Sequence, residues 1–246
     1  MIELSNVTKR YAGKTAVDGL SLAIGWGELF AFLGPNGAGK TTTIKLLAGL
    51  LSPSEGRIRV GGCDLCTHSR EARRLLGYVP DQPYLYDKLT GREFLQFIVE
   101  IYGMGGERAR RNVAEQIDTF AMSDYIDELA ESYSHGMKQR LVFASALVHE
   151  PRVLVVDEPM VGLDPKSARL VKDLLREQAQ GGTTVFMSTH TLNVAEEIAD
   201  SIGIVDRGRL LFHGPLDDLR HEQETETSFE KLFLRITERG TPLRRR

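Results

Sequence analysis

The stretch Gly34 to Thr42, GPNGAGKTT, combines glycines, a lysine and hydroxyl side chains at a spacing suited to binding phosphate. It matches the pattern G-x-x-x-x-G-K-[ST] in full. Glycines let the backbone curl so that its N–H groups point at phosphate oxygens, and a helix that begins there adds partial positive charge. In this chemistry Lys40 binds the β- and γ-phosphates, and the Thr41 hydroxyl binds Mg²⁺. The predicted cradle consists of Gly34, Pro35, Asn36, Gly37, Ala38, Gly39, Lys40, Thr41 and Thr42.

Two consecutive acids, Asp157 and Glu158, follow the apolar run VLVV. One carboxylate at the end of a strand can hold Mg²⁺ through water, and the next can accept a proton from an attacking water. Acids after a buried strand can also be no more than the solvated edge of a sheet. In a chain that carries a complete phosphate loop, we interpret Asp157 as a Mg²⁺ ligand and Glu158 as the base.

The stretch YSHGMKQR, Tyr133 to Arg140, precedes a further apolar run and is typical of a helix start. Ser134 is a favourable N-cap, and Gly136 permits a close approach of the backbone. Because a helix start collects unpaired N–H groups, it also attracts anions. The stretch by itself leaves open whether it is only a capped helix or also a phosphate contact.

Short strand patterns that alternate with helical patterns must position these side chains. Strands predicted at ELFAFLG, LGYVP, RVLVVDEP and TTVFMST favour an α/β fold with a mostly parallel sheet. A further strand is predicted at RIRVGG, a helix at TTIKLLAGLL, and a hairpin at GIVDRGRLLFHG with its turn near Gly208. The opening segment, to about residue 30, lacks helical periodicity, and we expect it to form an antiparallel β layer beside the main sheet.

Helical patterns without strands fill the middle of the chain from Thr90 onward. Thr90 and Glu93 have the spacing of a capping box at the first of these helices. We predict a helical lobe, roughly residues 84–150, inserted into the α/β core. The chain would then comprise a single domain, residues 1–220, and a charged tail, residues 221–246, with a short amphipathic helix at SFEKLFLRIT.

Composition excludes several classes of protein. The 246 residues carry a formal net charge of −3, which gives no electrostatic case for nucleic acid as the main partner. No apolar run approaches the roughly 18 residues needed to cross a bilayer, and no signal peptide is visible, so we expect a cytosolic chain.

Cys63 and Cys66, with His68 nearby, are interpreted as reduced thiols in a surface loop. A closed zinc site needs four ligands, and no second cysteine pair exists.

The order of these motifs resembles the nucleotide-binding subunit of ATP-binding cassette (ABC) transporters. A phosphate loop, a long helical insert, an S-x-G stretch, DEP, GLDP and STH follow one another, and the match extends to about residue 215. The resemblance implies that two such domains meet head to tail, as a homodimer or a heterodimer, and enclose two ATP molecules with Mg²⁺. It also implies polytopic membrane permease subunits as partners.

Further site residues follow from the resemblance by their register. His190, in MSTH, matches the histidine that contacts the γ-phosphate, and it joins Lys40 and Glu158 as a catalytic residue. Tyr11 matches the aromatic residue that stacks on adenine, with packing in the β layer as the alternative. Asp164, in VGLDP, matches an aspartate that communicates across the dimer, although an acid before a proline at a helix start can serve only as a cap.

Two adjacent stretches depart from or extend the family pattern. In YVPDQP, Asp81 takes the position of a glutamine that faces Mg²⁺ and water, and Gln82 lies one step later. Register favours Asp81, whose negative charge the metal would balance. The following YLYDKLT lies where family members touch their membrane partner, so Tyr84, Leu85 and Tyr86 are candidate contacts, with core packing as the alternative.

The stretch YSHGMKQR falls at the family's signature, whose usual form is Leu-Ser-Gly-Gly-Gln. Ser134 and Gly136 keep the usual residue types, whereas His135 replaces a glycine. The resemblance implies that Ser134, His135 and Gly136 complete the ATP site of the opposite chain. His135 can add an N–H donor there or obstruct the approach, and both interpretations stay open.

The resemblance implies an ATPase that energises transport as a peripheral protein on the cytoplasmic face of the cell membrane. The phosphate-loop region, GLDP and the tail look most like the export branch with separate permeases. One alternative is a soluble ABC ATPase that works on ribosomes or DNA, which the single phosphate loop and the lack of sustained heptads disfavour. The other is a regulatory subunit with weak hydrolysis, which Glu158 and His190 disfavour.

Overall fold

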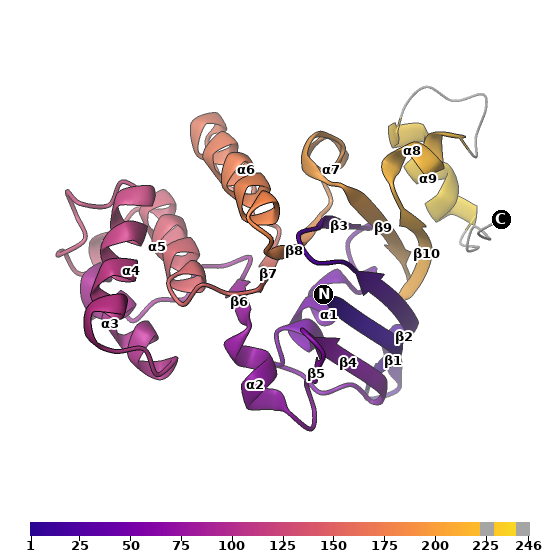
Figure 1. Cartoon of the computed structure of the whole chain (residues 1–246). Coiled ribbons are helices and arrows are strands. Elements are labelled where there is room, and N and C mark those ends of the chain that lie inside the picture. Colours follow the sequence, from indigo (N-terminus) through magenta and orange to yellow (C-terminus); the bar gives the residue numbers. More distant parts are fainter. Residues whose placement is uncertain (222–228, 240–246) are drawn as a thin grey trace.

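A computed structural model gives the architecture of the chain and describes residues 1–221 and 229–239 (Figure 1). The larger sheet contains β3 (Leu29–Leu33), β6 (Leu76–Val79), β7 (Val153–Asp157), β8 (Thr184–Thr189), β9 (Ser201–Asp206) and β10 (Arg209–Gly214). Its six strands lie in the order β10-β9-β3-β8-β7-β6. All neighbours pair in parallel except β9 and β10, which form the predicted hairpin.

A smaller antiparallel sheet lies beside it, as predicted for the opening segment. Its strands are β1 (Ile2–Tyr11), β2 (Lys14–Ile24), β4 (Glu55–Val60) and β5 (Cys63–Asp64). They lie in the order β2-β1-β4-β5, so a later part of the chain returns to extend the layer. Cys63 therefore belongs to a two-residue strand rather than to a loop, and Cys66 is exposed.

Helices cover the larger sheet and form a separate group on one side of it (Figure 1). Their bounds are α1 (Lys40–Leu47), α2 (Ser69–Arg74), α3 (Gly91–Ile101), α4 (Gly106–Thr119), the short 3-10 helix η1 (Ala130–Ser132), α5 (His135–Leu147), α6 (Pro165–Gln180), α7 (Leu192–Ile198), α8 (Leu216–His221) and α9 (Phe229–Arg239). Helices α3, α4 and α5 contact one another and follow β6 and precede β7 in the chain. They correspond to the predicted helical insert.

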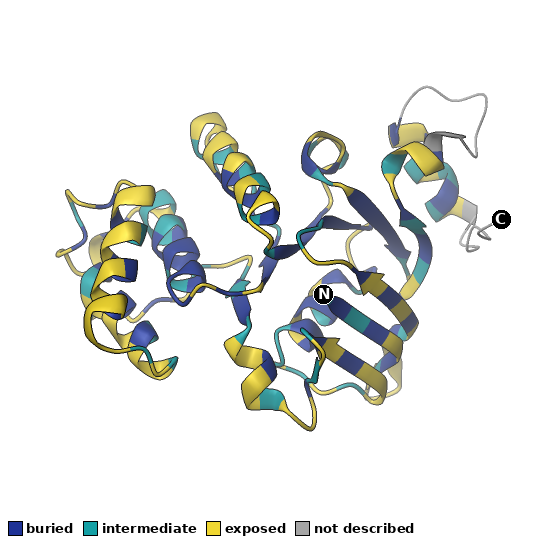
Figure 2. Cartoon of the chain, in the orientation of Figure 1, coloured by how far each residue is buried: buried dark blue, intermediate teal, exposed yellow. Residues whose placement is uncertain are grey.

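Buried side chains form two clusters, one on each face of the larger sheet, and strands β3, β7 and β8 of this sheet are buried along their full length (Figure 2). Along β3, Leu29 and Leu33 belong to the cluster that includes the helices of the insert, whereas Phe30 and Phe32 belong to the cluster with the smaller sheet and α1. This alternation is the period of two expected for a strand. Phe186 of β8 lies 5.3 Å from both phenylalanine ring centroids. Burial on both faces fixes the strand ends that carry the candidate site.

Local sequence signals define several helix ends. The Thr90–Glu93 capping box is confirmed: Thr90 Oγ1 accepts the Glu93 N–H at 3.1 Å, and the Glu93 carboxylate accepts the Thr90 N–H at 2.8 Å. Helix α1 ends at Leu47, whereas the prediction extended to Leu51. The helix stops there because Gly49 adopts a left-handed conformation, with φ of 68°.

Helix α9 covers the predicted amphipathic segment of the tail from Phe229 onward and extends beyond it to Arg239. Its residues Phe229, Leu232 and Ile236 are buried, and the helix packs against α7, α8 and β9. The charged residues 222–228 and the terminal residues 240–246 of the predicted tail lie outside the described residues. Within residues 1–221 and 229–239, no helix combines the length and the hydropathy needed to span a bilayer.

Candidate nucleotide site

The carboxyl ends of β3, β7 and β8 lie at one edge of the larger sheet. Strand β3 ends at Leu33, and a tight loop leads into α1, which begins at Lys40. Gly39 in this loop has a φ of 107°, and a Cβ there would lie 2.5 Å from the carbonyl oxygen of Ala16. Only glycine fits this position. The loop therefore brings the unpaired N–H groups of the α1 start close to the sheet edge, where they can bind an anion.

Lys40 is buried, and its ammonium group lies over the loop. Its Nζ donates to the carbonyl oxygen of Gly34 at 2.7 Å and to that of Pro35 at 3.4 Å. The same nitrogen lies 3.6 Å from Oε1 of Glu158. These contacts hold a positive charge between the phosphate loop and the end of β7.

Glu158 contacts residues from two other elements. It follows β7 with a φ of 47°, a left-handed conformation that is uncommon for a residue with a Cβ. Its Oε2 lies 2.9 Å from Nδ1 of His190 and accepts the His190 N–H at 3.3 Å. The Glu158 carboxylate therefore contacts Lys40 through Oε1 and His190 through Oε2. These three residues are the ones predicted to be catalytic.

Asp157 is 1% exposed, and its two carboxylate oxygens differ in their partners. Oδ1 accepts the hydroxyl proton of Ser188 at 2.5 Å, whereas Oδ2 has no hydrogen-bond partner among the described residues. Burial raises the pKa of the Asp157 carboxyl, and the charges of Asp81 and Glu158 add to this, while the Ser188 hydrogen bond opposes it. A buried carboxylate oxygen without a hydrogen-bond partner is a hard oxygen donor of the kind that Mg²⁺ prefers.

A cavity of about 720 Å³ lies over the phosphate loop and collects most of the predicted residues. It is lined by Lys14, Thr15, Ala16, Pro35, Asn36, Gly37, Gly39, Lys40, Thr41, Thr42, Asp81, Gln82, Glu158, Val161, His190 and Arg207. Asp81 and Gln82 both line the cavity, so its lining does not decide which of the two takes the position of the family's glutamine. Gly34 and Ala38 are buried parts of the same loop.

Sequence reasoning missed two cationic residues of this cavity, Lys14 and Arg207. Arg207 lies on the β9–β10 turn with a φ of 48°. The next residue, Gly208, donates its N–H to the carbonyl oxygen of Ala38 at 2.8 Å, which ties the turn to the phosphate loop. No local pattern predicts that Arg207 lies at the phosphate loop, because this position depends on the parallel pairing of β3 with β9. The sequence signal that could have found it was the predicted turn near Gly208.

Tyr11, Asp157 and Asp164 do not line this cavity. Tyr11, at the end of β1, is 42% exposed, and Nζ of Lys9 lies 5.3 Å from its ring centroid. Asp164 caps α6, since its carboxylate accepts the N–H of Lys166 at 2.9 Å and the hydroxyl proton of Ser167 at 2.6 Å. These hydrogen bonds lower the pKa of the Asp164 carboxyl. Capping is therefore one established role of this residue.

The stretch from Ser134 to Gly136 begins α5, away from the cavity. Ser134 Oγ accepts the N–H of Met137 at 3.3 Å, so the predicted N-cap is confirmed. His135 is exposed, and its ring lies beside Gly162, where an added Cβ would be 3.3 Å from Nε2. Neither Ser134, His135 nor Gly136 lines the cavity of its own chain.

The three candidate membrane contacts divide into two kinds. Leu85 is buried in the core, so core packing is the correct interpretation for this residue. Tyr84 and Tyr86 are 80% and 49% exposed. The ring of Tyr86 packs edge to face against Tyr84 and Phe97, with centroids 6.4 and 5.6 Å away, and forms an exposed aromatic cluster at the start of the insert.

The glycine-rich phosphate loop lies between the buried parallel strand β3 and helix α1, and two acids stand at the end of β7. This arrangement defines a nucleotide-binding protein of the phosphate-loop class. A family model described as ABC transporter matches residues 17–161. The daunorubicin resistance ATP-binding protein DrrA3 of Streptomyces coeruleorubidus is 37% identical over 239 residues, covering 97% of this chain and 74% of that protein. The Nod factor export ATP-binding protein I of Burkholderia orbicola is 39% identical, covering 87% of this chain and 70% of that protein.

Solved structures agree with these relatives. An ATP-binding subunit of an ABC transporter has a TM-score of 0.90 at 31% identity, with 96% of this chain and 99% of that chain covered. The ATP-binding cassette MJ0796, described as dimeric, in a post-hydrolysis state and bound to ADP and Pi, has a TM-score of 0.80 at 27% identity, with 88% and 99% covered. The chain belongs to the ABC transporter family, as an ATP-binding domain of it. The family predicted from the motifs is confirmed.

Proposed function

We propose that this chain binds and hydrolyses Mg-ATP as the ATP-binding subunit of an ABC exporter, at the cytoplasmic face of the cell membrane. The observation that carries the proposal is the placement of the Glu158 carboxylate, 3.6 Å from the Lys40 ammonium and 2.9 Å from the His190 ring, at a cavity over the phosphate loop. Relatives named for drug resistance and for Nod factor export support the transport role and its direction.

Binding of the substrate would change the partners of Lys40. In the described structure the ammonium interacts with two loop carbonyls and with Glu158. A γ-phosphate carries more negative charge than one carboxylate, so Lys40 would exchange Glu158 for the phosphate. The exchange leaves the Glu158 carboxylate able to accept a proton from water. His190, whose ring Nδ1 contacts the same carboxylate, would direct its other nitrogen toward the γ-phosphate.

The candidate metal ligands are Thr41, Asp157 and Asp81. The buried Oδ2 of Asp157 and the cavity-lining hydroxyl of Thr41 provide hard oxygen donors, and Asp81 lines the same cavity. Mg²⁺ bound there would neutralise phosphate charge during transfer. The charge of Asp81, which raises the pKa of Asp157, would also be balanced by the cation.

A second ABC subunit would complete the site. Ser134, His135 and Gly136 lie outside the cavity of their own chain, which supports a role opposite the ATP held by another chain. Asp164, in the loop that contacts the His135 ring, would lie at the same junction. The similar cassette MJ0796, which is described as dimeric, supports the participation of a second chain. Tyr11 is exposed at the end of β1 and would stack on adenine.

The membrane permease is proposed to contact the exposed aromatic cluster. Tyr84, Tyr86 and Phe97 present apolar rings at 80%, 49% and 37% exposure. Large exposed aromatic residues in one patch are typical of protein contact surfaces. The cluster begins a few residues after Asp81, so a movement of the permease there can be transmitted to the cavity through a short segment of chain.

Replacement of Glu158 by Gln tests the proposed hydrolysis. The amide keeps the size of the side chain but cannot accept the proton, so ATP turnover should fall by about 10²- to 10⁴-fold while ATP affinity stays within about threefold. Phosphate release and calorimetric titration measure the two effects. Glu177→Gln, an exposed acid on α6, is the control and should keep the parental rate. Near-parental turnover in Glu158→Gln would refute the assigned base, whereas a parent that binds ATP without turnover would indicate a regulatory subunit.

A further inference from the structure

Ser188 is a fully buried residue near the carboxyl end of β8 whose hydroxyl contacts both consecutive acids. Oγ donates its proton to Oδ1 of Asp157 at 2.5 Å and accepts the N–H of Glu158 at 3.0 Å. Ser188 and Asp157 are register partners in the parallel pair of β7 and β8. The hydroxyl therefore extends sideways between neighbouring strands, directly beneath the proposed catalytic edge.

The first hydrogen bond occupies one of the two carboxylate oxygens of Asp157. A serine hydroxyl has one proton, and here that proton is bound to Oδ1. Oδ2 is buried and has no hydrogen-bond partner within residues 1–221 and 229–239. Buried polar atoms in native proteins nearly always have a partner, so a carboxylate oxygen without one beside the phosphate-loop lysine and the second acid has the capacity to accept a bound group. Ser188 thus leaves Oδ2 as the oxygen available to a cation or to its water.

The second hydrogen bond supports the unusual backbone of Glu158. The last register pair between β7 and β8 is Asp157 with Ser188. The N–H of Glu158, the residue after β7, is therefore bound by a side chain instead of a strand carbonyl. The chain can then turn into the left-handed conformation, φ 47°, that directs the Glu158 carboxylate to Lys40 and His190. One hydroxyl therefore supports the geometry of both acids.

We propose that Ser188 is a positioning residue for the Mg²⁺ site: its hydroxyl presents Oδ2 of Asp157 to the cation and holds the backbone of Glu158. The inference rests on the proposed Mg-ATP function and extends it to the residue that orients the two acids. Partners that orient a metal ligand change metal affinity by about 10- to 100-fold when they are removed. A residue that only fills space would affect binding with and without metal alike.

Two substitutions test this role. Ser188→Ala removes both hydrogen bonds, and Ser188→Cys keeps nearly the same volume with a much weaker donor. Binding of a non-hydrolysable ATP analogue is measured by calorimetry in EDTA and across a series of MgCl₂ concentrations. We expect both variants to need about tenfold more Mg²⁺ for half-maximal enhancement of binding, with affinity in EDTA changed less than about twofold.

Thr184→Val is the matched control, because Thr184 is equally buried at the other end of β8 and its hydroxyl bonds to the carbonyl oxygen of Gly25 at 2.8 Å. Its Mg²⁺ requirement should equal that of the parent. An unchanged requirement in both Ser188 variants overturns the inference, as does an equal loss of affinity with and without Mg²⁺. If Ser188→Ala does not fold, Ser188→Cys decides. A parent that binds the analogue without any Mg²⁺ dependence instead refutes the proposed function itself.

Discussion

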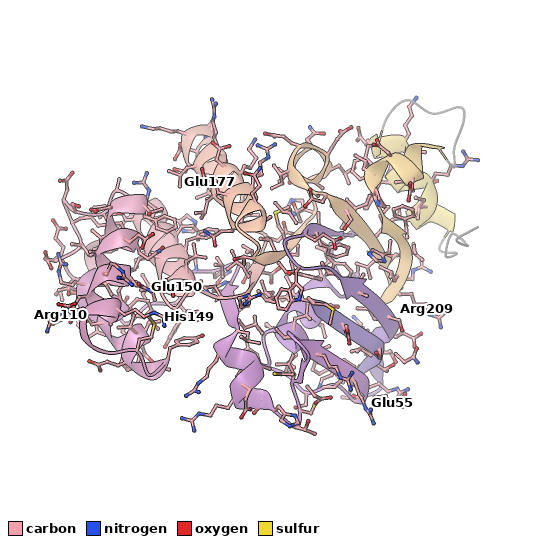
Figure 3. All side chains as sticks on the ribbon, in the orientation of Figure 1. Glu55, Arg110, His149, Glu150, Glu177 and Arg209 are labelled. Atoms are coloured by element: carbon pink, nitrogen blue, oxygen red, sulfur yellow. The ribbon has the colours of Figure 1, made fainter. Side chains whose placement is uncertain are left out.

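His149 lies after α5, where the helical insert meets the larger sheet (Figure 3). Its ring stacks on Tyr102 with centroids 3.6 Å apart. Nε2 lies 3.0 Å from the carbonyl oxygen of Leu76, and the Tyr102 hydroxyl donates to the same oxygen at 3.2 Å. Nδ1 has no hydrogen-bond partner in the part of the chain that the structure describes. Burial lowers the pKa of His149 to about 4, so the ring is neutral at pH 7.

This depressed pKa predicts a loss of stability in acid. As the pH falls below 6.5, the unfolded chain binds a proton on His149 before the folded chain does, so the free energy of unfolding decreases until about pH 4. The full effect is about 3 kcal/mol. His149→Phe can stack on Tyr102 but cannot titrate, so its stability should vary less between pH 4.5 and 7.5 in urea denaturation. His68→Gln, at an exposed position, should follow the parent. Equal pH slopes in His149→Phe and the parent would contradict the burial argument.

Residues that belong to a local motif were predictable, and residues that approach from distant strands were not. Lys40, Thr41 and Glu158 stand in motifs whose spacing has a chemical reason, and all three line the cavity. Ser188 and Arg207 carry no such spacing. Their positions follow from which strands pair in the larger sheet, and hydrophobic patterns do not specify that order, because every buried parallel strand has the same apolar pattern.

At the scale of elements, the start of α5 combines a cap with a proposed contact to ATP. Ser134 accepts the N–H of Met137, so Ser134→Ala should lower the free energy of unfolding by about 1 kcal/mol and Ser134→Gly by only a few tenths. Both changes remove the hydroxyl proposed to face the ATP of another chain, so both should weaken ATP-driven dimerisation equally. Denaturation and size-exclusion chromatography measure the two effects.

The cap of α3 provides the comparison for this prediction. Thr90 caps α3 with a capping box and lies outside the cavity. Thr90→Ala should therefore cost about 1 kcal/mol of stability without changing dimerisation. Ser134→Gly could dimerise like the parent while Ser134→Ala does not. Dimerisation would then depend on the stability of the helix start, and the proposed contact of the Ser134 hydroxyl with ATP would be wrong.

Elements with strong local signals were predicted well. Caps and left-handed glycines are encoded within a few residues, which explains the agreement at Thr90, Ser134 and the turn near Gly208. The smaller sheet was predicted only in part. Strand β4 pairs with β1 across a long separation in sequence, and β5 pairs with β4. No local property of RIRVGG indicates which sheet it joins.

At the scale of the whole molecule, the proposed site is formed by two chains, and this proposal predicts a dimer that depends on nucleotide. Glu158→Gln should accumulate the ATP-bound dimer because it cannot leave that state by hydrolysis. With Mg-ATP, the apparent mass in size-exclusion chromatography should move from one 27.4 kDa chain to two, and Mg-ADP should not cause this change. Lys40→Ala, which lacks the phosphate-binding ammonium, should remain a monomer. A dimer that forms equally without nucleotide would contradict an ATP-dependent junction.

The hydrogen bond from Gly208 to Ala38 has a consequence for biosynthesis. The strand that carries the phosphate loop, β3, lies between β8 and β9, and the turn after β9 bonds to the loop itself. Arg209 closes the same region by pairing with Asp18, 191 residues earlier. A ribosome translates the phosphate loop early and its neighbours late. The phosphate loop can therefore gain the support of this turn only after residues 208 and 209 have been translated, about 170 residues after the loop itself.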